Sequence, residues 1–242
     1  LHSSYAPVVD SAAWQLTSAI NSLRDPDGRI AVPGVYDQVR PASDREKQLV
    51  EKYSTIDAQL LVKSFKLSAP LLNSQTRAKL LQSLYFSPAL NIEGISSGYE
   101  ENGVKTVLPA EARAKLEIRL VPDQKPRDIF DKVVDFLKNK GFNNVKAVYT
   151  LGEDPYRSDL SSPEIERVLK AMHKVYQGDL ALLPTSQGTG PMAYFDENFH
   201  SSIAAVGIGY PNSADHAPDE NVRIKDYFDH IDFIKELIKS YE

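Results

Sequence analysis

The clearest structural signal in this chain lies in residues 112–121, which read Ala-Arg-Ala-Lys-Leu-Glu-Ile-Arg-Leu-Val. Apolar and charged residues alternate through it: Ala114, Leu116, Ile118 and Leu120 against Lys115, Glu117 and Arg119. A period of two is typical of a β-strand with one face on a core and the other toward water. We therefore expect a half-buried strand here.

The flanking sequence extends this strand into a layered unit. A helical pattern at 127–140 ends at Gly141, and strand-like residues follow at Val145–Leu151. Upstream, Leu90–Ile95 and Lys105–Leu108 also have strand character, and residues 11–23 have helical spacing behind a cap at Asp10 or Ser11. This order predicts a small α+β sandwich.

Further helices are expected between these elements and after them. Ser43 and Glu46 have the spacing of a capping box, and Thr76–Leu84 repeats the apolar helical period. Beyond residue 157 we expect helix, strand, helix, strand, loop and helix, beginning at Ser162-Pro163. We place a domain boundary near residue 158. The last part has too few strands for an independent sheet, and we expect its missing strands upstream of Leu1.

Composition excludes several classes of protein and site. The chain has 242 residues, 42% of them hydrophobic, a formal net charge of −5 and no cysteine. Without a basic block, nucleic acid and anionic membrane surfaces are disfavoured as partners. No apolar run approaches the ~20 residues of a membrane span. Any transition metal would have to be held by His, Asp and Glu.

Residues 207–224 contain the most informative histidine. His216 lies in a polar, turn-rich loop that follows the apolar run Ser202–Ile208 and precedes an amphipathic helix, with Asp215 and Glu220 nearby. Open α/β sheets present ligands at the carboxyl ends of their strands. From residue chemistry alone, His216 is either a metal ligand or a solvated, salt-bridged side chain.

Five sequence motifs, in this order, resemble the dinuclear-zinc family of dipeptidases, carboxypeptidases and aminoacylases, closest to its carnosinase-type branch. They are Leu1-His2-Ser3-Ser4, Lys105-Thr106-Val107-Leu108-Pro109, Ile118-Arg119-Leu120-Val121-Pro122, Ser186-Gln187-Gly188-Thr189-Gly190-Pro191 and the His216 loop. The resemblance implies a ferredoxin-like lid and dimerisation domain at 1–157. It implies the C-terminal α/β layers of a metallopeptidase catalytic domain at 158–242, with the N-terminal segment of that domain absent.

The resemblance also implies roles for individual residues. His216 corresponds to a ligand of one of two divalent ions, Zn or Mn, that share a bridging water. Asp215 or Glu220 would orient its ring, although both are equally well explained as solvated loop charges. His2 corresponds to a catalytic lid histidine that reaches the neighbouring subunit's site and hydrogen-bonds the oxyanion. Against this stands the tendency of chain ends to fray.

Four residues correspond to binding positions for the substrate's carboxylate: Thr106, Arg119, Thr189 and Gly188. Arg119 would provide a bidentate fork and Thr106 a hydroxyl across the dimer. Glycines around Thr189 would let backbone N–H groups approach an anion. The alternatives are a surface threonine, an arginine paired with Glu117 or Asp123, and an ordinary loop entering a helix.

Two local matches to metal-site motifs are rejected. His230-Ile231-Asp232 lies in the terminal helix, where residues two apart point in nearly opposite directions. Glu100-Glu101 precedes the turn signal Asn102-Gly103. We interpret the first as surface residues and the second as a loop.

The sequence thus predicts part of a cytoplasmic, homodimeric metallodipeptidase that cleaves small peptides with a metal-activated water. Because each ion needs about three protein ligands and this chain offers one, the chain alone is expected to be inactive. Three alternatives stay open: an N-acyl amino acid amidohydrolase, a non-catalytic dimerisation and substrate-binding module, and an unrelated α+β ligand-binding domain.

Overall fold

The computed structural model describes residues 1–68, 71–72, 76–210 and 212–242. It contains a short 3-10 helix, Ser3–Tyr5, and the following elements: α1 Ala12–Ser22, α2 Asp44–Tyr53, α3 Ala58–Ser64, α4 Arg77–Phe86, β1 Ala89–Ser97, β2 Ala112–Arg119, α5 Pro126–Asn139, α6 Pro163–Val175, α7 Met192–Phe199 and α8 Ile224–Lys239. The fold combines helices with a small antiparallel sheet. Both the strand at 112–121 and the helix at 127–140 are thereby confirmed.

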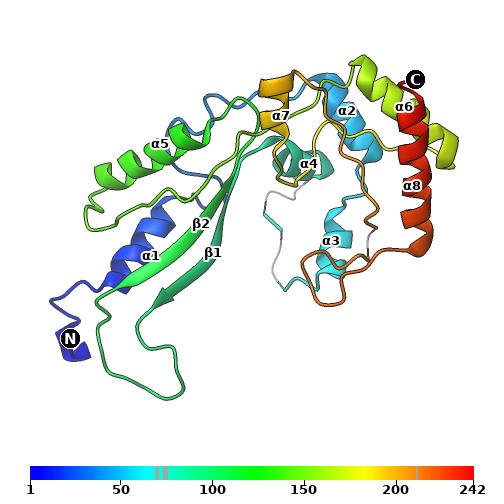
Figure 1. Cartoon of the computed structure of the whole chain (residues 1–242). Coiled ribbons are helices and arrows are strands. Elements are labelled where there is room, and N and C mark those ends of the chain that lie inside the picture. The colour runs from blue at the N-terminus through cyan, green and yellow to red at the C-terminus, as the bar shows by residue number, and fades with distance from the viewer. Residues whose placement is uncertain (69–70, 73–75, 211) are drawn as a thin grey trace.

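The elements form two arms that meet at the top of an arch (Figure 1). One, which we call the sheet arm, consists of α1, β1, β2 and α5. The other, the helical arm, consists of α2, α3, α4, α6, α7 and α8. Chain order makes the polypeptide pass between the arms three times, before α2, before β1 and before α6.

The sheet arm is built on an antiparallel pair, β1 and β2, which runs in register from Ala89 opposite Arg119 to Ser97 opposite Ala112. The register shifts between Ile92 and Gly94, as at a β-bulge. Helices α1 and α5 cover one face. Their contact buries the larger of two hydrophobic clusters: Ala19, Leu23, Ile30, Val32, Val35, Ile129, Val133 and Leu137.

Local sequence explains the ends of these helices. Ser11, one of the two residues expected to cap α1, accepts a hydrogen bond from the backbone N–H of Trp14. Pro126 occupies the first turn of α5, where its missing N–H costs nothing. Gly141 ends the helix in the left-handed region at φ +88°, which a side chain would disfavour.

Two expected strands of the sheet arm are absent as paired strands. Residues 145–151, all described, alternate between inward and outward positions, and Tyr149 stacks edge-on against Phe130 at 5.3 Å between ring centroids. They pack on α5 and join no sheet. The segment Lys105–Leu108 instead bonds with the start of the chain. Alternation therefore predicted which side chains are buried, but backbone pairing needs a neighbouring strand in reach.

In the helical arm, α2 and α4 pack together over the second hydrophobic cluster: Ala42, Val50, Leu81, Tyr85 and Phe86. The capping box predicted at Ser43 and Glu46 is present at the start of α2. Thr76 caps α4. Leu183, from the last part of the chain, packs on this cluster, so residues expected within the first domain share a core with the second part. The boundary near residue 158 stays a prediction.

The last part of the chain folds as helices joined by extended segments. Ser162 caps α6 and Pro163 follows it, as predicted, and α6 packs against α8. The two strands expected in this part are not formed as a sheet: residues 179–184 and 201–208, all described, lie outside any strand ladder. A strand gains its hydrogen bonds from neighbouring strands, and the described residues provide no ladder partner for these two segments.

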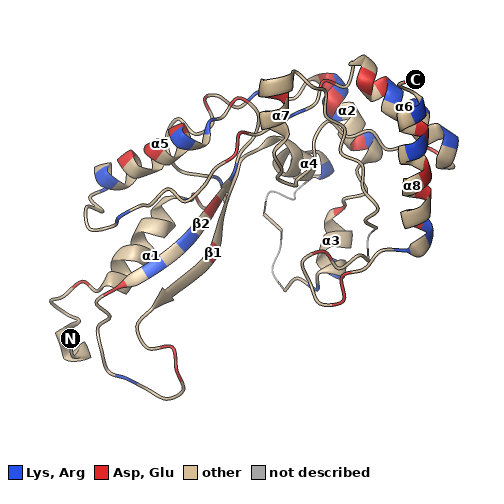
Figure 2. Ribbon diagram, viewed as in Figure 1, with Lys and Arg blue, Asp and Glu red and all other residues tan. Residues whose placement is uncertain are grey.

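Charges of both signs are spread over α2, α5, α6 and α8, whereas α1 carries none (Figure 2). Among the described residues, none of the helices is long and apolar enough to cross a membrane.

Candidate functional site

His2 and Thr106 lie side by side at the far end of the sheet arm. The N–H of Ser3 donates to the carbonyl of Thr106 at 3.1 Å, and the N–H of Leu108 donates to the carbonyl of Leu1 at 2.8 Å. These bonds form a short antiparallel bridge between His2 and Val107. Two of the predicted site residues, 104 positions apart, are therefore neighbours, and the chain start is hydrogen-bonded.

The ring of His2 is held from one side. Its Nδ1 accepts from the backbone N–H of Ser4 at 3.1 Å and lies 2.9 Å from the hydroxyl of Ser4. When neutral, the ring then carries its proton on Nε2. Since His2 is exposed, that N–H is available as a donor toward a group outside this chain.

Arg119 stands where β2 ends and faces the loop before α7. Its Nη1 donates to the carbonyl of Gln187 at 2.6 Å, and its Nη2 lies 3.0 Å from a carboxylate oxygen of Glu117. The pairing with Glu117 is one of the alternatives considered from sequence. A guanidinium has five N–H donors, so these two contacts leave donors free for a carboxylate.

The contact to Gln187 brings Arg119 beside Gly188 and Thr189. Thr189 is exposed, and its hydroxyl has no hydrogen-bond partner in the part of the chain that the structure describes. The N–H of Gly188 donates to the hydroxyl of Ser186 at 3.3 Å. A Cβ at Gly188 would meet only Ser186, at an ordinary 3.5 Å, so packing does not explain a glycine there.

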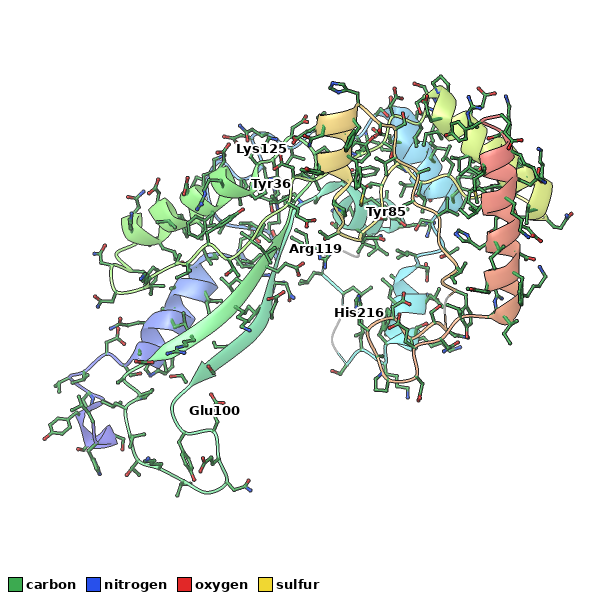
Figure 3. The ribbon with its side chains drawn as sticks, viewed as in Figure 1. Tyr36, Tyr85, Glu100, Arg119, Lys125 and His216 are labelled. Carbon is green, nitrogen blue, oxygen red and sulfur yellow. The ribbon has the colours of Figure 1, made fainter. Side chains whose placement is uncertain are left out.

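His216 occupies the tip of a loop in the helical arm, at φ +61° (Figure 3). The loop is closed at its base by residues that the sequence analysis did not single out. Tyr210 donates its hydroxyl to Asn221 at 2.6 Å, its N–H donates to the hydroxyl of Ser213 at 2.7 Å, and the N–H of Asn221 donates to the carbonyl of Ser213 at 2.9 Å. Ser and Asn side chains commonly close turns in this way, which is the signal that could have identified them.

The described residues do not form a metal site by themselves. No group of three His, Asp or Glu side chains with suitable geometry occurs within 1–68, 71–72, 76–210 and 212–242. His216, Asp215 and Glu220 are all exposed, and only the first is an imidazole donor.

The structure divides the eight predicted residues into three groups. His2 and Thr106 form one, Arg119, Gly188 and Thr189 a second, and the His216 loop with Asp215 and Glu220 a third. Figure 3 shows Arg119 on the sheet arm and His216 on the helical arm. The second group spans the two arms, and sequence alone did not predict which residue would make that contact.

The rejected metal motifs lie away from these groups. Glu100 accepts from the N–H of Ser97 at 3.0 Å in the exposed loop between β1 and β2. Asp232 is exposed, as expected, but His230 is half-buried, with its ring centroid 5.4 Å from that of Phe233. The interpretation of His230 as a surface residue is corrected, because it lies on the side of α8 that packs.

An acidic cavity of about 180 Å³, which sequence reasoning did not identify, lies where the arms meet. Lys125 at its edge binds Asp154 and lies 3.4 Å from Glu197 of α7. The hydrogen bond to Asp154 raises the pKa of Lys125 above its ordinary value of 10.5. Lys125 thus remains a cation that joins the turn after β2 to α7.

Residues 1–145 match a protein family described as a peptidase dimerisation domain. The chain is 26% identical to the rat Beta-Ala-His dipeptidase, over 92% of this chain and 46% of that protein. It is 24% identical to a Cys-Gly metallodipeptidase of Candida albicans, over 94% of this chain and 47% of that protein. The chain spans about half the length of these relatives.

A solved structure and a relative of another activity complete the comparison. The structure of an M20 family metallo-carboxypeptidase from Sulfolobus solfataricus superposes with a TM-score of 0.91 and 34% identity, covering 100% of this chain and 55% of that one. A probable succinyl-diaminopimelate desuccinylase of Staphylococcus epidermidis is 28% identical over 58% of this chain and 35% of that protein.

Proposed function

Because this chain belongs to the M20 peptidase dimerisation-domain family, we propose that it is the lid and the C-terminal catalytic part of a metallodipeptidase. In this proposal residues 1–157 form the lid, with ferredoxin-like topology, and residues 158–242 complete a catalytic domain. The substrate is a dipeptide or short peptide with a free C-terminus.

The contact between Arg119 and Gln187 carries the proposal. It ties Arg119 of one arm to a residue two positions before Thr189 of the other, and Arg119 and Thr189 are two of the four residues proposed to bind a carboxylate. The planar guanidinium of Arg119 and the nearby hydroxyl of Thr189 can both donate hydrogen bonds to the C-terminal carboxylate of a substrate. Recognition of that group would separate cleavage at a free C-terminus from cleavage within a protein chain.

The remaining roles follow the same proposal. His216 would ligate one of two divalent ions, Zn or Mn, which supply an activated water when bound, while Asp215 or Glu220 orients its ring. The other ligands would come from outside the residues described, since the described residues hold no cluster of three. Thr106 would bind the substrate's carboxylate with its hydroxyl across a dimer.

His2 would donate its Nε2 proton to the oxyanion in the partner subunit. That role needs a dimer through the sheet arm. The uncharged surface of α1 supports one, because Trp14 is 69% exposed there. Sedimentation analysis of the chain measures the dimer directly.

The test is Arg119→Lys in the full-length enzyme, assayed on a dipeptide and on the same dipeptide with an amidated C-terminus. A lysine cannot reproduce the fork. Losing one charge-assisted hydrogen bond costs about 1.5–3 kcal/mol, so kcat/KM should fall about 10- to 100-fold for the free dipeptide. The amide should lose little.

Arg113→Lys serves as the matched control, because Arg113 lies on the same strand and is paired with Glu111 at 3.0 Å in an exposed position. It should leave both substrates unaffected. Equal losses on both substrates in Arg119→Lys would remove Arg119 from carboxylate binding and with it the proposed site.

A second candidate is an amidohydrolase that releases an acyl group from an N-acylated amino acid. The match to the desuccinylase favours keeping it. A dipeptide and an N-acyl amino acid both carry a free C-terminal carboxylate, so Arg119 would serve either reaction. Parallel assays of a dipeptide and an N-acyl amino acid distinguish them.

A further inference from the structure

The three connections between the arms converge on one buried side chain, Arg157. It lies in the last connection, between α5 and α6. Its Nη1 is 3.4 Å from Oε1 of Glu46 in α2, just after the first connection. Its guanidinium lies 5.1 Å from the ring centroid of Phe86, the last residue of α4 before the second connection. The side chain of Arg157 is 0% exposed.

We call Arg157, Glu46 and Phe86 the junction. Through Glu46 the junction reaches the start of α2. Its second oxygen accepts from the N–H and the hydroxyl of Ser43, at 2.7 and 2.8 Å. Burial opposes the charge of Glu46, but the bonds from Ser43 and the positive charges of Arg157 and Arg40 outweigh it and hold its pKa below 4.5. Glu46 is therefore a carboxylate that caps a helix and faces a buried cation at once.

The connections on both sides of the contact between Arg157 and Glu46 are also hydrogen-bonded. The N–H of Arg40 donates to the carbonyl of Pro122 at 3.2 Å, which ties the first connection to the turn after β2. The hydroxyl of Ser158 donates to the carbonyl of Ile203 at 2.6 Å and anchors the last connection in the helical arm. Asp123 and Arg40 complete the charged groups that act on Arg157.

Arg157 is poorly explained as a contribution to stability alone. Its Nε and Nη2 are buried without a hydrogen-bond partner among the described residues. Exchanging a buried ion pair for apolar groups of similar volume is often neutral or stabilising, whereas removing one partner is costly. Buried charges are attested as devices that select one arrangement over others.

We propose that Arg157 is a positioning residue that fixes the angle between the two arms. The contacts of Arg119 with Gln187 and of Lys125 with Glu197 cross directly between the arms, but Arg119 and Lys125 are about half exposed. Arg157 is buried instead, and it holds the last connection against α2 and α4 of the helical arm, next to the points where the first two connections reach that arm. Its consequence for catalysis, the alignment of Arg119 with the loop at Thr189, rests on the function proposed above.

The test uses distance measurements and needs no turnover. The chain has no cysteine, so Lys138→Cys on α5 and Lys235→Cys on α8, both exposed, can carry two spin labels at defined places. Double electron–electron resonance then gives the distribution of distances between the arms. With Arg157 and Glu46 unchanged, the distance distribution should show a single narrow peak.

Two variants remove the junction in different ways. Arg157→Met keeps most of the volume and removes the charge. Glu46→Gln keeps the shape and the capping box, since Gln also serves at that position, but removes the charge that faces Arg157. Each should change the narrow peak into a broad or shifted one. Because Glu46→Gln is isosteric, it decides the matter even if Arg157→Met fails to fold.

Arg167→Met is the matched control. Arg167 also has a buried, unpartnered Nε among the described residues, but its contacts, with Tyr241 and the carbonyl of Ser240, lie at the end of the chain and touch none of the three connections. It should lower the melting temperature and leave the inter-arm distance unchanged. An unchanged distribution in Glu46→Gln, or equal broadening in Arg167→Met, would overturn the proposal.

Turnover in the full-length enzyme separates this inference from the proposed function. Arg157→Met and Glu46→Gln should misalign the two arms and so lower kcat on the free dipeptide and on its amide alike. Arg157→Lys, which keeps the charge, should lose less activity than Arg157→Met. Arg119→Lys should instead discriminate between the two substrates. If Arg119→Lys shows no discrimination while Glu46→Gln still broadens the distances, the carboxylate site fails and the role of Arg157 stands.

Discussion

The two arms differ in how their extended segments and helix surfaces are covered. In the sheet arm, β1 and β2 pair along their length, and α1 and α5 bury eight residues beneath them. In the helical arm, residues 179–184 and 201–208 lie outside any ladder. Helix α8 packs on α6 through Phe233, yet it exposes apolar side chains elsewhere: Ile224, Tyr227, Phe228, Ile234 and Ile238.

This difference shows that similar sequence patterns can find most of their packing and pairing partners in one part of the chain and fewer of them in another. A helix that is apolar on most sides is normally enclosed, and an extended apolar segment normally has strand neighbours. In the sheet arm, β1 and β2 pair with each other and α1 and α5 share a buried core, while Trp14 of α1 stays exposed and residues 145–151 join no ladder. The helical arm offers backbone groups and apolar side chains for further packing, which agrees with the proposed place of its residues 158–242 in a larger catalytic domain.

The largest expected effect contrasts two isoleucines on helices. Ile129 of α5 is 2% exposed and Ile238 of α8 is 60% exposed. Ile129→Ala should lower the free energy of unfolding by about 2–5 kcal/mol, because it leaves a cavity in the sheet arm. Ile238→Ala should change it by less than about 0.5 kcal/mol. Urea denaturation of the chain measures both.

The two isoleucines also provide a way to break the comparison. If Ile238→Ala costs as much as Ile129→Ala, the outer face of α8 is covered in solution, for example by a second copy of the chain. Repeating the denaturation over a range of protein concentrations identifies that case, because the stability of a dimer rises with concentration.

A smaller effect is expected at Gln124, which is 1% exposed in the sheet arm. Its Nε2 donates to the carbonyl of Val35 at 2.7 Å, and its Oε1 accepts from the N–H of Val121 at 2.9 Å. Gln124→Leu leaves both backbone groups buried and unpaired, so unfolding should become easier by about 1–3 kcal/mol. Gln82→Leu, at an exposed position of α4, is the control and should have almost no effect.

The smallest expected effect is the loss at low pH of the contact that Glu236 makes between α6 and α8. Hydrogen bonds from Lys239 and Lys174 lower the pKa of Glu236 from 4.5 to about 2, and Lys174 belongs to α6 while Glu236 belongs to α8. Because the folded pKa lies below the unfolded one, this contact stabilises fully above pH 4.5 and is lost as the pH falls toward 2. The apolar packing of the sheet arm has no such dependence.

Glu236→Gln should remove this pH dependence, whereas Asp232→Asn on the same helix should keep it. NMR signals of α6 and α8, followed between pH 6 and about 2, report the change locally. If signals of the sheet arm shift over the same range and those of α6 and α8 do not, the assignment of the acid-sensitive contact to the helical arm is wrong.

The sequence by itself determined most of the local structure. Caps at Ser11, Ser43 and Ser162, the alternation at 112–121 and Gly141 after α5 all predicted elements correctly, since each depends on residues a few positions apart. The motifs also predicted the family. Of the site, the sequence supplied His2, Thr106, Arg119 and His216 as candidates with no indication of which of them meet.

Only the tertiary structure decided which segments pair and what joins the arms. Residues 145–151 have the pattern of a strand but pack on α5, and residues 105–108 pair with the chain start, where His2 lies opposite Val107. The contacts of Arg119 with Gln187 and of Arg157 with Glu46 span 68 and 111 residues. Side-chain pattern records only burial and local backbone preference, whereas partners are selected by packing in three dimensions.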